Sequence, residues 1–294
     1  MSIEIHFRNK EDAEALCFFL QQQLQDKSIG EYTLHFEDSH IVRCRNQSNR
    51  KEEFLQWTKR GLCHFIMKVK LDDWLKNILA AYYYRDEEEQ QQIIDIVHSI
   101  LNGKNVELNT FLPKMNLNEQ LFVLIHEWFR KQSVFSFDHF IKFRLRFLIT
   151  ELEKYVELSL DEYKMEQEYQ VFIQRLREFV YERSPKLTKL HLLFDEGITF
   201  FNEHFAEMKR GDLIGMIDRR LLINHPVYVD SVTIAPLLSI APSNIYLYTN
   251  DLEQPLVRTI RNIFEERVIY KPISAFTEMK NGFRSLSTKK DKSS

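Results

Sequence analysis

The segment "FSFDHFIKFRLRFLITELEKYV", from Phe135 to Val156, decides the fold, because it combines basic residues with an unusual number of phenylalanines. On a helical wheel, Phe143 and Phe147 fall on the same side as Phe140. The neighbouring sector holds further apolar side chains, so the apolar arc covers more than half of the circumference. A helix of this kind packs against neighbours on more than one side. The segment therefore predicts a buried helix at the centre of a helical core.

One basic residue of this helix, Arg144, falls inside the apolar arc. An unpaired charge is costly to bury, so we expect a carboxylate partner for it. The next predicted helix, 161–183, carries Glu162 and Glu166 on or beside its inward stripe, and Glu151 is an alternative partner within the first helix. Two interpretations follow. The pair fixes how the two helices register, or Arg144 is the centre of a polar site for an anionic ligand.

The composition indicates an α+β protein that is predominantly α. The chain has 294 residues, 44% of them hydrophobic, and only 7 Gly and 7 Pro, the two residues that interrupt helices. Its net charge of −3 gives no overall attraction to phosphate backbones or anionic lipid. Cys17, Cys44 and Cys63 form no close pair, which argues against a zinc site or a disulfide framework and favours a reducing cytoplasm.

No export signal or membrane span is expected. The beginning, "MSIEIHFRNKED", carries acidic residues where a secretory signal has a basic start and a long apolar run. The longest charge-free run, Ser231–Asn250, is long enough to span a bilayer, but Pro236 and Pro242 interrupt it.

Changes in hydrophobic periodicity divide the chain into four predicted parts. These are a β-α-β-β unit at 1–48, a helical core at 49–185, a β-hairpin plus βαβ-like unit at 186–276, and a flexible polar tail at 277–294. Within the core, two successive helices are expected at about 137–158 and 161–183. The arrangement that we expect is one mixed sheet system, built from both ends of the chain, with the helical block inserted between them.

Motifs that carry chemistry are missing from the sequence. GxxxxGK[ST], GxGxxG and GxSxG do not occur, and no cofactor or metal is predicted. A weak polar cluster is formed by His204 and Glu207, which could share a metal on a helix face, with His225 as a possible third member.

The two central helices also carry a family resemblance. The stretch "FDHFIKFRLRFLITELEKYVELSLDEYKMEQEYQVFIQRLREFVYE" contains F-x-x-F-R-L at Phe140–Leu145 and E-x-E-Y at Glu166–Tyr169. It resembles the YtxC-type sporulation proteins of endospore-forming bacteria, and so do the later "LLSIAPSNIYLY" and "RVIY". His139 stands where the family often has glycine, and Pro236 interrupts what is more often a continuous helix. The resemblance implies a cytoplasmic, sporulation-linked protein, without an established activity or catalytic residues to carry over.

Three functions therefore remain open. The leading hypothesis is a non-catalytic factor that binds an unknown protein partner. The second is an enzyme or small-anion-binding protein with its polar site around Arg144 and Glu166. The third is a nucleic-acid-binding protein, against which the sequence argues, because Phe135–Arg183 carries eight Lys and Arg but ten Asp and Glu.

Overall fold

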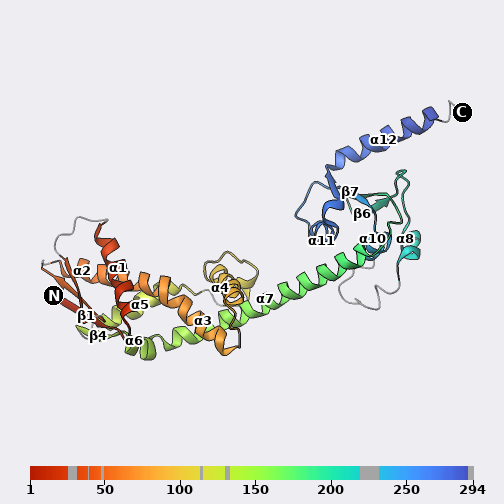
Figure 1. The fold of residues 1–294 in the computed structure, drawn as a ribbon. Coiled ribbons are helices and arrows are strands. Elements are labelled where there is room, and N and C mark those ends of the chain that lie inside the picture. The colour runs from red at the N-terminus through yellow and green to blue at the C-terminus, as the bar shows by residue number, and fades with distance from the viewer. Residues whose placement is uncertain are drawn as a thin grey trace. The chain divides into compact units, whose positions relative to one another are not determined.

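A computed structural model describes residues 1–25, 32–38, 40–47, 50–112, 115–129, 133–218 and 232–290. The chain forms two compact units, Met1–Glu166 and Gln167–Ser294. Both combine helices with a small sheet, so the predicted α+β, predominantly α class is confirmed (Figure 1).

The first unit contains a four-stranded sheet in the order β2-β3-β1-β4. Strands β1 and β2 pair antiparallel with β3, whereas β4 pairs parallel with β1. Alternate residues of β1 and β3 point into the core, and the charged residues between them point to the other face. The strands are β1 (Ser2–His6), β2 (Tyr32–Glu37), β3 (Ile41–Asn46) and β4 (Val134–Ser136).

Helices of the same unit share one hydrophobic core with this sheet, which extends from Ile3 to Tyr163 in the sequence. Asp86 caps one helix by accepting backbone hydrogen bonds, and Gly103 follows that helix at φ +70, where glycine is unstrained. The helices are α1 (Lys10–Gln25), α2 (Lys51–Phe65), the π-helical turn η1 (Ile66–Lys70), α3 (Leu71–Ala81), α4 (Glu87–Leu101), the short η2 (Leu108–Thr110), α5 (Leu117–Phe129), α6 (Phe137–Arg144) and the first part of α7 (Arg146–Tyr181).

The Phe-rich segment Phe135–Val156 does not form the single helix that its pattern predicts. The predicted helix at 137–158 is interrupted at Leu145, whose backbone N–H bonds to the carbonyl of Phe140 at 3.2 Å. From Arg146 onward, the remainder of this helix and the predicted 161–183 helix form the single helix α7. The expected packing of two neighbouring helices is therefore replaced by one continuous helix.

The second unit contains its own four-stranded sheet, in the order β6-β5-β7-β8. The predicted hairpin is the antiparallel pair β5–β6, and the predicted βαβ unit is the parallel pair β7–β8 with α11 between them. Its elements are β5 (Lys189–Phe194), β6 (Ile198–Phe201), α8 (Arg210–Met216), α10 (Ile234–Ile240), β7 (Asn244–Tyr248), α11 (Pro255–Phe264), the short η3 (Glu265–Arg267), β8 (Val268–Lys271) and α12 (Ile273–Lys290).

Helices cover both faces of this second sheet. Leu190 and Ile245 belong to a core that also includes residues of α10, α11 and the end of α7. On the opposite face, Tyr248 belongs to an aromatic cluster that Phe276 of α12 completes. The predicted polar tail at 277–294 belongs to this helix as far as residue 290.

Two other features differ from the predicted organisation. The described strands form two separate sheets, not one mixed system, because β4 of the helical block completes the first sheet and β8 completes the second. The unit boundary lies within α7, near Glu166, since Ile173 and Val180 pack into the second core.

Candidate functional site

Arg144 does not form the predicted buried ion pair. Its side chain is exposed at the end of α6, Glu166 is also exposed, and Glu162 is half-buried. An α-helix rises about 1.5 Å per residue, so Glu162 lies more than about 20 Å beyond the start of α7 at Arg146. The prediction failed because the expected pair of packed helices does not form: Arg144 ends α6, and both glutamates lie farther along α7, which begins at Arg146. Both interpretations of a buried Arg144 centre are thereby removed.

The weak cluster predicted around His204 does not have the helical geometry that was expected for it. His204 lies in a turn and Glu207 in an isolated β-bridge, so the assumed helix face does not exist. His204 Nε2 lies 3.6 Å from the carboxylate of Glu203, and its ring contacts that of Phe283. His225 lies outside the described residues. Within the described part of the chain, no group of three His, Cys, Asp or Glu side chains could hold a metal ion.

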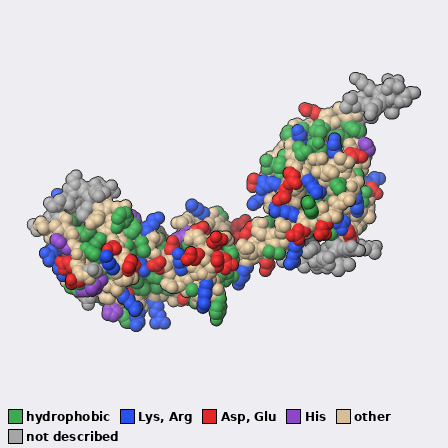
Figure 2. All heavy atoms as spheres, in the orientation of Figure 1, with side chains coloured by type: hydrophobic (Ala, Val, Ile, Leu, Met, Phe, Trp, Pro, Cys, Tyr) green, Lys and Arg blue, Asp and Glu red, His purple; other side chains and the backbone are tan. Residues whose placement is uncertain are grey.

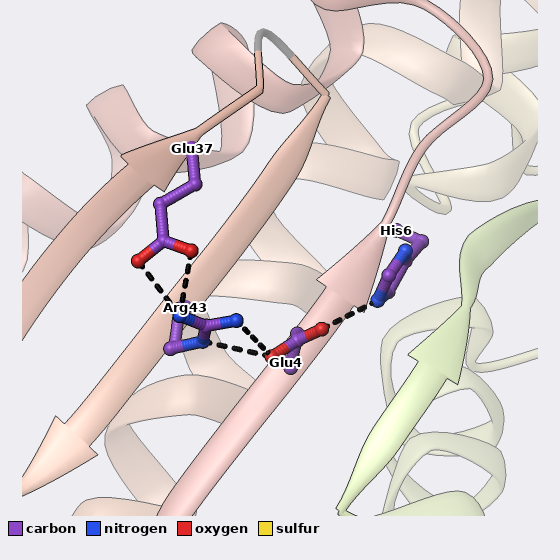
Figure 3. A network of polar contacts seen from close by, with 4 residues as sticks. All are labelled: Glu4, His6, Glu37 and Arg43. Carbon is purple, nitrogen blue, oxygen red and sulfur yellow. Dashed lines mark hydrogen bonds and ion pairs between the residues drawn. The ribbon is translucent and has the colours of Figure 1, made fainter.

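A network of charged side chains crosses the outward face of the first sheet (Figure 3). Arg43 of β3 lies between Glu4 of β1 and Glu37 of β2, with its Nε 2.7 Å from Glu4 and its Nη1 2.7 Å from Glu37. His6 Nε2 donates to the other oxygen of Glu4 at 2.7 Å. The hydrogen bond from Arg43 lowers the pKa of Glu4. Because the guanidinium of Arg43 bonds both carboxylates, this network links the three strands β1, β2 and β3.

A groove between α2 and α5 is the best candidate for a binding site. Its volume is about 1130 Å³, at the upper limit of small-molecule pockets. Trp57 and Tyr32 line it with rings 5.3 Å apart, and the Trp57 indole N–H donates to the carbonyl of Leu20 at 3.3 Å. On the α5 side, Phe122 and Val123 supply apolar surface. The aromatic lining is thus held in place before any ligand binds.

Beneath Phe122 lies a lysine that the sequence analysis did not single out. Lys59 is buried, its Nζ donates to Nδ1 of His126 at 2.5 Å, and the ring of Phe122 lies 5.9 Å from Nζ. Burial lowers the pKa of Lys59. Lys59 follows Leu55 by four residues and precedes Leu62 by three, so the helical period already placed it on the apolar stripe of α2.

The thiol in the groove is not activated. Cys63 donates to Oδ1 of Asn118 at 3.8 Å, and burial raises the pKa of Cys63 to about 11. A reactive cysteine needs the opposite shift, toward the thiolate. Cys63 therefore contributes a small apolar surface to the wall of the groove.

The rim of the groove is acidic. Glu52 and Glu53 of α2 and Glu119 of α5 line it and are exposed, against the single guanidinium of Arg60. An apolar interior with an acidic rim complements a ligand that carries apolar groups together with positive charge.

Comparisons with known proteins point to one family. The model of the YtxC-like family matches residues 56–269. A Bacillus subtilis (strain 168) protein described as "Uncharacterized protein YtxC" is 36% identical over 285 residues, which cover 94% of this chain and 96% of the relative. No solved structure matches the chain. Among the described residues, no helix is both long and apolar enough to cross a bilayer.

Proposed function

The chain belongs to the YtxC-like family, and we propose that it is a cytoplasmic, non-catalytic protein-binding factor that acts during sporulation. The link to sporulation is what the resemblance of the two central helices implies. Three buried free thiols, Cys17, Cys44 and Cys63, suit the reducing cytoplasm. The observation that carries the binding role is the acid-rimmed aromatic groove between α2 and α5.

The occupant that we propose for the groove is a basic amphipathic segment of a partner protein. Grooves between helices accept the apolar face of such segments, which anchor through a few side chains. Trp57 and Phe122 offer the surface for apolar anchors, and the three glutamates of the rim favour Lys and Arg at the edges of the segment. The acidic rim disfavours an anionic segment for the same reason.

Chemical features of the groove support binding over catalysis. Its thiol is held protonated, with the pKa of Cys63 raised to about 11. Lys59 is buried and is not among the residues that line the groove. A ligand in the groove therefore meets rings, a valine, amide side chains, His64 and a carboxylate rim, and the one thiol there is not activated.

Peptide selection tests the binding role. A random 16-residue peptide library displayed on phage is selected on the full chain, and the enriched peptides are titrated against two variants. Val123→Glu places a charge in the groove, where Val123 is 55% exposed. Val106→Glu is the matched control, because Val106 is 74% exposed and lies outside the groove.

We expect enriched peptides to combine large apolar residues with Lys or Arg and to lose at least tenfold in affinity for Val123→Glu alone. Selection of acidic peptides, equal binding to both variants, or no enrichment would refute the groove as the binding site. For the cellular role, we expect deletion of the gene to lower the yield of heat-resistant spores, with rescue by Val106→Glu but not by Val123→Glu. An unchanged spore yield after deletion would contradict a role in sporulation.

A further inference from the structure

The junction of α6 and α7 exposes phenylalanine together with basic residues. Phe143 is 68% exposed and Phe147 is 72% exposed, although the sequence pattern placed both with the buried Phe140. Lys142, Arg144 and Arg146, which lie among them, are exposed as well. These five residues, 142–144, 146 and 147, are called the junction ridge. Figure 2 shows Lys and Arg side chains projecting where Figure 1 draws α6.

The break at Leu145 explains why the ridge faces outward. Leu145 and Leu148 are buried, and they anchor the junction to the core together with Phe140. Once these side chains point inward, Phe143 and Phe147 lie on the outer side of the two helices. Exposed apolar side chains that lie close together in the chain, unlike those scattered singly, are typical of contact surfaces for proteins or membranes.

The ridge is locally basic in a chain whose net charge is −3. From residue 138 to 150, the sequence carries three Lys and Arg but only one acid, Asp138. Lys142 Nζ lies 5.6 Å from the ring of Phe143, so its aliphatic stem runs beside the ring while the ammonium stays near water. Within the described part of the chain, Arg144 forms no ion pair that would neutralise it.

We propose that the junction ridge binds the surface of a membrane that contains anionic lipid. Phe143 and Phe147 insert at the boundary between headgroups and acyl chains, and Lys142, Arg144 and Arg146 contact the anionic headgroups. Phenylalanine beside lysine and arginine is the composition by which peripheral proteins hold to such surfaces.

The geometry favours lipid over nucleic acid. Both rings are about seven-tenths exposed, so they protrude instead of lining a groove in which bases could stack. The ridge spans only about 8 Å of helix, too short to follow more than a few phosphates of a strand. Lipids diffuse laterally, so several anionic headgroups can gather around a compact group of cations.

Vesicle flotation with the full chain tests this proposal. The vesicles are phosphatidylcholine alone or phosphatidylcholine with 30% phosphatidylglycerol, at low and at high salt. One variant, Phe143→Ser with Phe147→Ser, removes the inserting rings, and another, Arg144→Glu with Arg146→Glu, reverses the charge. The matched controls are Phe111→Ser, whose ring is also 72% exposed, and Lys76→Glu with Lys104→Glu.

We expect the wild-type chain to float with the anionic vesicles at least ten times more than with the neutral ones, and high salt to reduce this binding. Both ridge variants should lower it at least tenfold, with melting temperatures near that of the wild type, whereas both controls should bind normally. The proposal is overturned if the wild type does not float, if the controls lose as much as the ridge variants, or if the ridge variants instead lose retention on single-stranded RNA. The junction ridge and the groove are tested with different variants, so a negative result for one proposal does not contradict the other.

Discussion

The ammonium of the buried Lys59 donates to Nδ1 of His126 at 2.5 Å, which joins α2 to α5 beneath the groove. An ammonium can only donate, so Nδ1 of His126 is the acceptor of this hydrogen bond. The contact places a charged amine within the packing between α2 and α5.

Two substitutions of Lys59 separate the energetic cost of burying its charge from the stabilisation that its aliphatic chain gives by packing. Lys59→Met should leave the free energy of unfolding within about 1 kcal/mol of the wild type or raise it, because an apolar side chain of similar length avoids desolvation. Lys59→Ala should be about 2 to 4 kcal/mol less stable than Lys59→Met, because it leaves a cavity. Urea unfolding at pH 7 measures both. Equal stability of the two variants would show that the site is not tightly packed.

Gly61 of α2 packs tightly against Leu20 of α1. A Cβ at this position would lie 2.3 Å from Cδ2 of the fully buried Leu20. Gly61→Ala should therefore destabilise the protein by about 1 to 3 kcal/mol, despite the better helix propensity of alanine. The control Gly211→Ala, in α8 with open space around it, should be neutral or slightly stabilising. Thermal unfolding distinguishes these outcomes, and a stabilising Gly61→Ala would contradict the close packing.

Arg43→Met tests the network on the first sheet. The variant leaves Glu4 and Glu37 without the guanidinium between them, so it should be less stable than the wild type at neutral pH. The pKa of Glu4 is lowered in the folded protein, so its contribution is present above the ordinary carboxyl value of 4.5 and is lost as the pH falls below it. The difference in unfolding free energy between the wild type and Arg43→Met, measured by urea unfolding, should therefore become smaller from pH 6 to pH 3. Arg45→Met, an exposed arginine on the same strand, should show no such pH dependence.

His191 makes the second unit sensitive to acid. It lies buried against the ring of Phe205 with Nδ1 3.0 Å from the Tyr248 hydroxyl, and burial lowers the pKa of His191 from 6.5 to about 4, with Lys189 as a smaller cause. The unfolded chain then takes up a proton before the folded chain does, so stability is full above pH 6.5 and falls progressively toward pH 4. The expected loss reaches about 3 kcal/mol at the acid end.

Replacing His191 with a side chain that cannot take up a proton should weaken the dependence of stability on pH. His191→Phe is expected to lose less stability than the wild type between pH 6.5 and 4 in urea unfolding, whereas the exposed His204→Phe should behave like the wild type. The same pH profile for wild type and His191→Phe would count against a buried neutral imidazole.

Much of the secondary structure could be predicted from local pattern. The Asp86 cap, the glycine at 103, the hairpin β5–β6 and the β7–α11–β8 crossover all depend on residues close in sequence. Local rules of capping, turn formation and periodicity suffice for such features. The family was also recognisable, since its motifs are local.

The exposure of Arg144 could not be predicted from local pattern. Periodicity correctly placed Phe137, Phe140, Leu145 and Leu148 in the core, but it treated Phe143 and Phe147 in the same way. Helical periodicity determines which side chains share a face, whereas the tertiary structure decides which faces another element covers. The break at Leu145 and the fusion of two predicted helices into α7 changed both the neighbours of Arg144 and its exposure.

The sequence by itself therefore determined the fold class, most elements and the family, because these follow from composition, local hydrogen bonding and periodicity. Only the tertiary structure decided that Arg144 is exposed, that Lys59 meets His126, and that Trp57 and Phe122 line one groove. Those relationships join residues far apart in the chain, and they depend on how whole helices pack, which no local pattern encodes.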